Sequence, residues 1–461
     1  MTGRADDMLV IGLDGVPHWL LRLLADQAVM PQVAKLLPQA TLRPLRAPIP
    51  DISSTSWASF LTGADCGTHG IYGFIDLRPG SYQTYFPNLR DLRATPVWHP
   101  VGAGGRRSVV LNVPGTYPAP PMRGVLLSGF VAPDFDRAVY PPEVRKPLQD
   151  IGYQLDVTVG DVHADPFAFM DRVDAALAAR REAFRHILDT PGPTGGKDAQ
   201  LAVCVYTETD RVHHFLWRDL MDENSPVHER ILDFYGRLDA AVHELAERAG
   251  DGGLMIVSDH GFGPVTTQFH VNAWLRQAGY LALPRDAGSL TELDETTTAF
   301  ALDPGRIFLN RAGRFPRGRE LPVDELVEEI TAGLLALRRT PEGAITDAQV
   351  GEPVVAEVLR GTDLYDGPCR AAAADLVIVP APGVQVRGSW AVDELTVDGP
   401  LTGTHTREDA LFWLRGDRSD GPVEMRDVAP TVLGYLGIAP PPSMEGRDVS
   451  RRGMYTQPDR T

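Results

Sequence analysis

Short apolar segments that end in an acidic residue recur along the chain. Runs of this length are typical of strands buried on both faces of a sheet. In an open parallel sheet, ligands bind beyond the carboxyl ends of the strands. The runs therefore predict one site, gathered at one sheet edge. They are residues 8–13 before Asp14-Gly15, residues 201–206 before Glu208 and Asp210, and residues 254–258 before Asp259 and His260.

Segments with helical spacing alternate with these runs, which predicts an α/β fold. We expect a doubly wound, mostly parallel central sheet that is flanked by helices. Further strands are predicted at residues 108–112, 306–310, 375–379 and 410–413. Helices are predicted at residues 19–24, 53–62, 165–188, 229–249, 321–339 and 427–437.

The regular alternation stops after about residue 263, where turns become frequent, and resumes near residue 375. This change predicts a smaller α+β lobe inserted into the core. The expected division is a catalytic core of residues 1–264 and 375–461 and an inserted lobe of residues 265–374.

The composition of the 461 residues excludes several classes of protein. A formal net charge of −17 argues against a nucleic-acid-binding surface, which needs clustered Lys and Arg. The 3 cysteines include no C-x-x-C pair, so a disulfide framework is not expected. No apolar run approaches the roughly 18 residues of a membrane span, and the N-terminus lacks the features of a signal peptide. We expect a cytoplasmic protein with no membrane contact; the sequence carries no prediction of its oligomeric state.

Carboxylates and imidazoles accompany the predicted sheet edge. Asp210 and His214 are four residues apart, which places both on one face of a helix, although His213 could compete with His214. His260 follows Asp259 directly, and His405 lies in a later loop. Together with Asp14, these groups suit two zinc-like ions.

Four hydroxyl groups crowd the start of the helix predicted after Pro50: Ser53, Ser54, Thr55 and Ser56. Free backbone N–H groups and the positive end of the helix dipole favour an anion there. A hydroxyl held between two metal ions would lose its proton and become a nucleophile. The pattern does not identify which of the four it is. His69, in a glycine-rich turn, is interpreted as structural.

At this point the sequence resembles the alkaline phosphatase superfamily, and within it the type I phosphodiesterase/nucleotide pyrophosphatase group. The resemblance covers nearly the whole chain, and the order and completeness of its motifs make it specific. The motifs are Gly12-Leu-Asp14-Gly15, Ser53-x3-Trp57-x-Ser59-Phe-Leu-Thr-Gly63, Gly67-x-His69-Gly-Ile71, Asn112-Val-Pro114-x-Thr-Tyr-Pro118, Asp210-x3-His214, Ser258-Asp-His-Gly-Phe262, Gly403-x-His405, Asp427-Val-Ala-Pro-Thr431 and Met444-Glu-Gly-Arg447.

The resemblance implies a role for each candidate. One metal ion would be held by Asp210, His214 and His405; the other would be held by Asp14, Asp259 and His260, together with the oxygen of the nucleophile. The register with Trp57 and Thr62-Gly63 makes Ser53 the nucleophile, with Ser54 and Thr55 as alternatives one and two residues away. The metal ions are expected to be zinc, with manganese as the alternative.

The chain departs from the group at the end of the H-G-I-x-G-x motif. Many nucleotide pyrophosphatases carry an Asn there that contacts a phosphate oxygen, whereas this chain has Phe74. Phe74, Asn112 and Arg211 are the predicted substrate contacts, and specificity is expected to lie in residues 74–93 and in the inserted lobe. The sulfatase branch is excluded because the nucleophile segment lacks its Pro and Arg.

The resemblance implies a metal-dependent hydrolase of phosphodiester or nucleotide pyrophosphate bonds that acts through a phosphoserine intermediate. Its substrate would be a small phosphorylated molecule such as a nucleotide. The alternatives are a phosphomonoesterase on the same core, a phosphate-ester mutase and a catalytically silent binding protein. The intact ligand set argues against the silent protein, and the absence of a long insert just after the nucleophile argues against the mutase.

Overall fold

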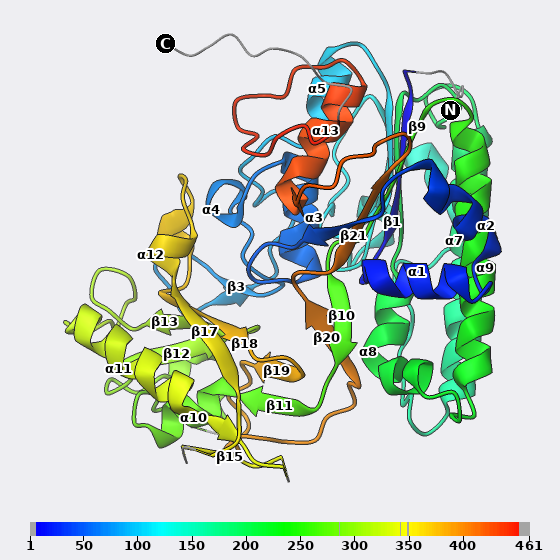
Figure 1. Ribbon diagram of the computed structural model, residues 1–461. Helices are drawn as coiled ribbons and strands as arrows, with labels where there is room; N and C mark the ends of the chain where they lie inside the picture. Colours follow the sequence, from blue (N-terminus) through cyan, green and yellow to red (C-terminus); the bar gives the residue numbers. More distant parts are fainter. Residues whose placement is uncertain (1–5, 285, 342, 348–349, 451–461) are drawn as a thin grey trace. The chain divides into compact units, whose positions relative to one another are not determined.

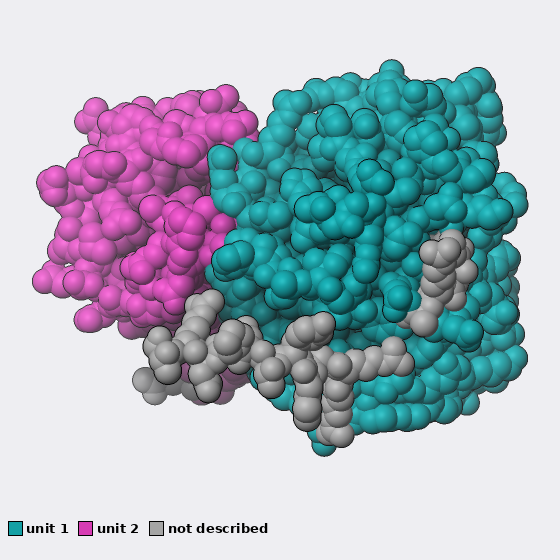
Figure 2. All heavy atoms as spheres, turned by 90° about the horizontal axis from the view of Figure 1, so that it is seen from above, with its two compact units in different colours: residues 1–65, 88–262, 405–461 teal, residues 66–87, 263–404 magenta. Residues whose placement is uncertain are grey.

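The computed structural model describes residues 6–450 apart from residues 285, 342 and 348–349, and it divides into two compact units (Figures 1 and 2). Unit 1 comprises residues 1–65, 88–262 and 405–461, and unit 2 comprises residues 66–87 and 263–404. The chain passes between the units four times: after residue 65, after residue 87, within β10 (Gly261–Pro264) and within β20 (Gly403–Thr406). No helix among the described residues is both long and apolar enough to cross a membrane.

A nine-stranded sheet forms the centre of unit 1, in the order β22-β2-β21-β9-β1-β8-β5-β6-β7. Its five central strands, β9 to β6, are parallel, and antiparallel strands flank them. The strands are β1 (Met8–Leu13), β2 (Arg43–Arg46), β5 (Ser108–Val113), β6 (Gly124–Ser128), β7 (Val139–Tyr140), β8 (Leu201–Tyr206), β9 (Gly253–Val257), β21 (Ala410–Leu414) and β22 (Val423–Glu424).

Helices cover both faces of this sheet (Figure 1). The side chains of β1 alternate between two apolar layers: Leu9 and Ile11 pack with α1, α2, α7, α8 and α9, whereas Met8 and Val10 pack with α3, α5 and α13. The predicted fold class, a doubly wound sheet between helices, is confirmed. The helices are α1 (His18–Asp26), α2 (Pro31–Leu36), α3 (Ser53–Thr62), α5 (Trp98–Ala103), α6 (Arg145–Ile151), α7 (Pro166–Asp189), α8 (Glu208–Met221), α9 (His228–Ala249) and α13 (Val428–Tyr435).

The register of the central strands brings the acidic endings together. Leu13 of β1 pairs with Tyr206 of β8, and Gly12 pairs with Val257 of β9. Because the three strands are parallel and neighbouring, the residues that follow them emerge at one sheet edge. This is the edge that the apolar runs predicted.

Unit 2 is built on a four-stranded antiparallel sheet of order β12-β13-β18-β17. Its strands are β3 (Asp76–Leu77), β4 (Thr84–Tyr85), β11 (Thr267–His270), β12 (Ala299–Leu302), β13 (Arg306–Leu309), β14 (Arg338–Arg339), β15 (Ile345–Thr346), β16 (Glu352–Pro353), β17 (Val355–Arg360), β18 (Leu376–Pro380) and β19 (Val384–Arg387). Its helices are α4 (Cys66–His69), α10 (Val271–Gln277), α11 (Val323–Ala336) and α12 (Gly361–Leu364).

The boundary of the inserted lobe differs from the predicted one in two places. The strand expected to resume the core is β18, which pairs with β13 and β17 and so belongs to unit 2. Residues 66–87 also join unit 2, because the buried guanidinium of Arg306 donates to the carbonyl of Ile75 and the backbone N–H of Cys369 donates to the carbonyl of Gly67. Both contacts link positions far apart in the sequence, which local periodicity does not reveal.

A buried ion pair joins α7 to the first turn of α8. Arg180 Nε donates to Glu208 Oε1 at 2.6 Å, and the two side chains are 1% and 0% exposed. Arg180 Nη1 also donates to the Tyr153 hydroxyl at 2.7 Å, which in turn donates to Asn112 Oδ1 at 2.9 Å. Burial alone would lower the pKa of Arg180, but the Glu208 carboxylate holds that pKa above its usual value. Arg180 therefore stays charged, and its contact with Glu208 fixes the start of α8.

We expect Glu208→Gln to lower the free energy of unfolding of unit 1 by about 3–5 kcal/mol, because it leaves the Arg180 charge buried without a counter-ion. The matched control is Glu244→Gln. Glu244 pairs with the neighbouring Arg181, and both of those side chains are 39% exposed, so the change should stay within about 1 kcal/mol. Urea denaturation followed by circular dichroism measures both. Equal losses would show that burial of the Arg180–Glu208 pair has no energetic consequence.

Candidate metal centre

Three carboxylates, three imidazoles and one hydroxyl converge at the carboxyl edge of the unit 1 sheet. They come from the ends of β1 and β9, from α8, which follows β8, from the start of α3 and from β20. The ligand atoms of Asp14, Asp259 and His260 lie within 4.8 Å of one another, as do those of Asp210, His260 and His405. His214 joins the second group, with Nε2 3.3 Å from Asp210 Oδ1 and 3.1 Å from His405 Nε2. All seven predicted ligands thus meet, with Ser53 Oγ 3.1 Å from His260 Nε2.

Backbone carbonyls orient two of the imidazoles. His405 Nδ1 lies 2.9 Å from the carbonyl oxygen of Asp51, and His260 Nδ1 lies 3.0 Å from that of Gly261. A carbonyl only accepts hydrogen bonds, so Nδ1 carries a proton in each ring and Nε2 is the nitrogen left to bind a metal ion. Both Nε2 atoms face the cluster, as ligation by these rings requires.

Each carboxylate has one oxygen engaged by a donor of the protein. Trp57 Nε1 donates to Asp14 Oδ2 at 3.0 Å, the Gly15 N–H donates to Asp259 Oδ1 at 3.0 Å, and Arg211 Nη1 approaches Asp210 Oδ2 at 3.4 Å.

The opposite oxygens of two of these carboxylates, Asp210 Oδ1 and Asp259 Oδ2, are buried and accept no hydrogen bond among the described residues. A buried acceptor without a partner is unfavourable, and a divalent cation satisfies it. The residues present therefore fit metal ions.

Burial and mutual repulsion shape the charge of this cluster. Burial, followed by the charges of Asp259 and Asp210, raises the pKa of the Asp14 carboxyl well above its usual value. Burial likewise raises the pKa of Asp259 to about 6. Burial alone would raise the pKa of Asp210 too, but His214, His405 and Arg211 hold it well below its usual value. Three carboxylates in one buried site thus call for added positive charge, which a bound cation supplies.

Only Ser53, of the four hydroxyls at the start of α3, contacts the cluster in the structure as described. Its Oγ lies 3.4 Å from Asp14 Oδ1, besides the contact with His260. Thr55 Oγ1 instead donates to the carbonyl of Ile52 at 2.7 Å, and the Oγ atoms of Ser54 and Ser56 are buried without a partner. The backbone N–H groups of Thr55 and Ser56 donate to the carbonyl of Ile52, at 3.1 and 3.0 Å. No side chain caps α3, so the N–H groups of Ser53 and Ser54 remain available to an anion.

His213, the competitor of His214, points away from the cluster. Its Nδ1 lies 2.8 Å from the carbonyl oxygen of Gly15, and its Nε2 contacts the hydroxyl of Tyr235. Both ring nitrogens are therefore engaged in the core. Glu208, the first acid after β8, is likewise turned inward to Arg180 and lies outside both ligand groups.

The predicted substrate contacts fall in three different settings. Asn112 is buried, and its amide bonds to the carbonyl of Val205 at 2.9 Å and to Tyr153; we correct its predicted role to a structural one. Arg211 lies at the cluster, beside Asp210. Phe74 belongs to unit 2, and its role stays a prediction.

Several side chains support the site without a clear signal in the sequence. Asp156 holds Arg211 through two hydrogen bonds, at 3.0 and 2.6 Å, from a loop that no pattern singled out. Thr209 Oγ1 donates to the carbonyl of Asp14 at 2.5 Å. The ring of Phe262 packs against His214 and His405, with centroid distances of 4.9 and 5.3 Å. Only Phe262 lies in a motif that the sequence singled out.

The family model described as type I phosphodiesterase / nucleotide pyrophosphatase matches residues 8–407 of the chain. No curated protein matches it in sequence. Among solved structures, phosphonoacetate hydrolase from Sinorhizobium meliloti 1021 in complex with phosphonoacetate is similar, with a TM-score of 0.60, 16% identity, and coverage of 93% of this chain and 95% of that chain.

Murine ectonucleotide pyrophosphatase/phosphodiesterase 5 is also similar, with a TM-score of 0.56, 13% identity, and coverage of 95% of this chain and 96% of that chain. An inactive threonine-to-alanine variant of that murine protein, in complex with AMP, gives a TM-score of 0.56 at 12% identity over 95% and 96% of the two chains. At these identities, the likeness to solved structures shows the fold.

We expect His214→Gln to weaken metal binding by at least about 100-fold, because it removes a direct ligand. Loss of a residue that only hydrogen-bonds to a ligand typically weakens metal affinity by about 10- to 100-fold. The matched control is His213→Gln, the adjacent residue whose ring nitrogens are engaged by Gly15 and Tyr235. Metal content per chain after dialysis, measured by mass spectrometry, separates the two variants. Equal metal loss in both would contradict the placement of His214 in the cluster.

Proposed function

Because the chain belongs to the type I phosphodiesterase/nucleotide pyrophosphatase family, we propose that it hydrolyses phosphodiester or nucleotide pyrophosphate bonds through a phosphoserine intermediate on Ser53. At the coarser level it is a phosphoric ester hydrolase of a metal-dependent family. The bond preference, the nucleophile and the number and identity of the metal ions are the parts that we propose.

One observation carries the proposal. The hydroxyl of Ser53 is 2% exposed, begins an uncapped helix, and lies 3.1 Å from His260 Nε2 and 3.4 Å from Asp14 Oδ1. A nucleophile needs an activating group within hydrogen-bonding distance and donors for the charge that develops on the phosphate. The cluster supports the first requirement and the free N–H groups of α3 support the second.

We assign two metal ions to the cluster. Asp210, His214 and His405 would hold one, and Asp14, Asp259 and His260 would hold the other beside the oxygen of Ser53. Imidazole and carboxylate donors favour zinc, with manganese as the alternative. Bound there, divalent cations lower the pKa of the attacking hydroxyl and stabilise negative charge on the phosphate oxygens.

The chain's own residues then perform two displacements. In the first, Ser53 Oγ forms a bond to phosphorus, the bond from phosphorus to the leaving oxygen breaks, and the leaving group takes up a proton. In the second, the oxygen of a water molecule bonds to phosphorus, the Oγ–phosphorus bond breaks, and Ser53 regains its proton. The N–H groups at the start of α3 donate to the phosphate oxygens in both steps.

The setting of Arg211 favours a diester over a monoester. A monoester dianion carries one more negative charge than a diester and gains more from a free cation. Arg211 stands beside Asp210, but its guanidinium is paired through two hydrogen bonds with Asp156. The Asp156 carboxylate therefore neutralises the positive charge of Arg211, which would otherwise bind the additional negative charge of a monoester.

We expect Ser53→Ala to reduce hydrolysis of bis-p-nitrophenyl phosphate by at least about 1,000-fold, because the covalent step is lost. The matched controls are Ser54→Ala and Ser56→Ala, whose hydroxyls lie in the same helix without a contact to the cluster. Wild-type turnover of p-nitrophenyl phosphate should be much slower than turnover of the diester.

The rates distinguish the alternatives. If Ser54→Ala loses activity and Ser53→Ala keeps it, the nucleophile is Ser54 and not Ser53. A preference for the monoester would make the protein a phosphomonoesterase. No turnover of either ester by metal-loaded protein would support a silent binding protein.

We further expect Asp156→Asn to raise the ratio of monoester to diester kcat/KM by about fivefold, roughly 1 kcal/mol, because it releases the charge of Arg211 toward the substrate. Steady-state assays of both nitrophenyl esters measure the ratio. The control is Asp171→Asn, which removes an exposed partner of an arginine in the helical layer. An unchanged ratio in Asp156→Asn would show that Arg211 does not determine the preference between the two esters.

A further inference from the structure

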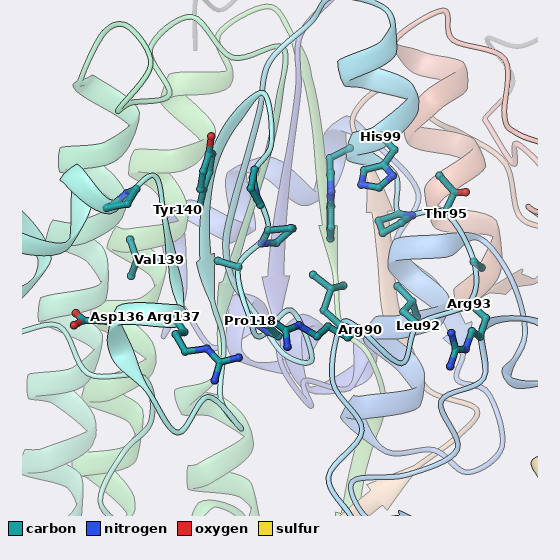
Figure 3. A pocket seen from close by; sticks show the side chains of 18 of the residues that line it. Arg90, Leu92, Arg93, Thr95, His99, Pro118, Asp136, Arg137, Val139 and Tyr140 are labelled. Atoms are coloured by element: carbon teal, nitrogen blue, oxygen red, sulfur yellow. The ribbon is translucent and has the colours of Figure 1, made fainter. Parts of the chain in front are cut away.

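A cavity of about 660 Å³ lies in unit 1, and Figure 3 shows side chains that line it. Three segments form it: residues 89–99, which lead into α5, residues 118–121 after β5, and residues 136–145, which include β7. None of the seven residues of the cluster lines it. It lies on the β6–β7 side of the sheet, and β6 is two strands from β8, or roughly 10 Å at the usual strand spacing.

The lining of this cavity is strongly cationic. It contains four arginines and one acid, Asp136, in a chain whose formal net charge is −17. Within the described part of the chain none of the four forms an ion pair, whereas arginines elsewhere, such as Arg43 and Arg180, pair with buried carboxylates. The four arginines are Arg90, Arg93, Arg137 and Arg145.

Two buried donors in the same lining also lack an acceptor among the described residues. They are Arg145 Nε and Trp98 Nε1, and the side chain of Trp98 belongs to a residue that is only 3% exposed. A buried donor without a partner costs about 1–3 kcal/mol. Other buried donors in the described chain, such as Arg43 Nε, also lack a partner, but these two lie in the cavity that gathers the four arginines, where a ligand can supply their acceptor.

Most of the remaining wall is apolar. Proline rings and aromatic or aliphatic side chains line it, among them Leu89, Leu92, Pro118, Pro120, Val139 and Tyr140. A pocket of this volume suits a small organic ligand, with apolar walls for its body and a few polar groups for its orientation. An inorganic anion alone would fit this cationic and apolar lining less well, because it would leave the apolar wall exposed to water.

We propose that this cavity is a second ligand site, which binds a small amphipathic organic anion. Its flat apolar body lies against the proline and aromatic wall, and its anionic groups meet the guanidiniums of Arg90, Arg93, Arg137 and Arg145. The site is separate from the metal-ligand cluster and fills independently of it.

Naphthalene-1,5-disulfonate is a suitable probe, because it carries two charges on a flat body and has no phosphate ester to hydrolyse. Calorimetric titration of the metal-loaded full chain should give one saturable site whose affinity falls with salt. Arg90→Gln with Arg93→Gln changes two exposed side chains and should weaken binding at least about tenfold, as should Arg137→Gln with Arg145→Gln. Arg22→Gln, an exposed change in α1, should leave binding unchanged.

Three further measurements complete the test. Naphthalene-1,5-diol, which has the same body without charges, should bind at least about tenfold more weakly. Inorganic phosphate, which targets the metal centre, should not displace the disulfonate. Ser53→Ala should bind the probe normally, so that failure of the proposed hydrolysis and failure of this site are distinguishable. The proposal is overturned by the absence of saturable binding, by unchanged affinity in both double variants, or by displacement with phosphate.

Discussion

Repulsion among three buried carboxylates is the constraint around which unit 1 is organised. Asp14 and Asp259 are 0% exposed and Asp210 is 3% exposed, and their ligand atoms meet within the reach of one small cluster. Charges gathered in this way are unstable unless cations and hydrogen-bond donors face them. The three parallel strands that deliver the acids to one edge, and the imidazoles that face them, follow from this requirement.

The elements beneath the cluster hold it in place through contacts on both faces of the sheet. The first turn of α8 is fixed by the buried pair of Glu208 and Arg180, and the same network continues through Tyr153 to the end of β5. On the other side of the sheet, Trp57 of α3 joins the apolar layer and places its indole N–H on Asp14. One helix from each layer thus positions one acid, which keeps the distances between the acids rigid.

The sequence predicted the strand endings and their acids because buried parallel strands are continuous apolar runs, a local pattern. The hydroxyl pattern alone did not choose between Ser53, Ser54 and Thr55, because that choice depends on where the first turn of α3 begins relative to the cluster; only the register of the family motif pointed to Ser53. It placed Asn112 among the substrate contacts because the position of Asn112 at the end of β5 is visible in the sequence, whereas its partners Val205 and Tyr153 are distant. The edge of unit 2 escaped prediction for the same reason, since β18 looks like any apolar strand until its pairing partners are known.

The engagement of one oxygen on each acid has a consequence for the choice of ion. With Asp14 Oδ2, Asp259 Oδ1 and Asp210 Oδ2 occupied by protein donors, each carboxylate offers a single oxygen. Monodentate ligation of this kind, combined with imidazole nitrogens, would give a low coordination number at a bound ion. Calcium requires six to eight oxygens and commonly takes carboxylates in the bidentate mode. The indole, amide and guanidinium donors around the site would therefore disfavour calcium, although none of them would touch the ion.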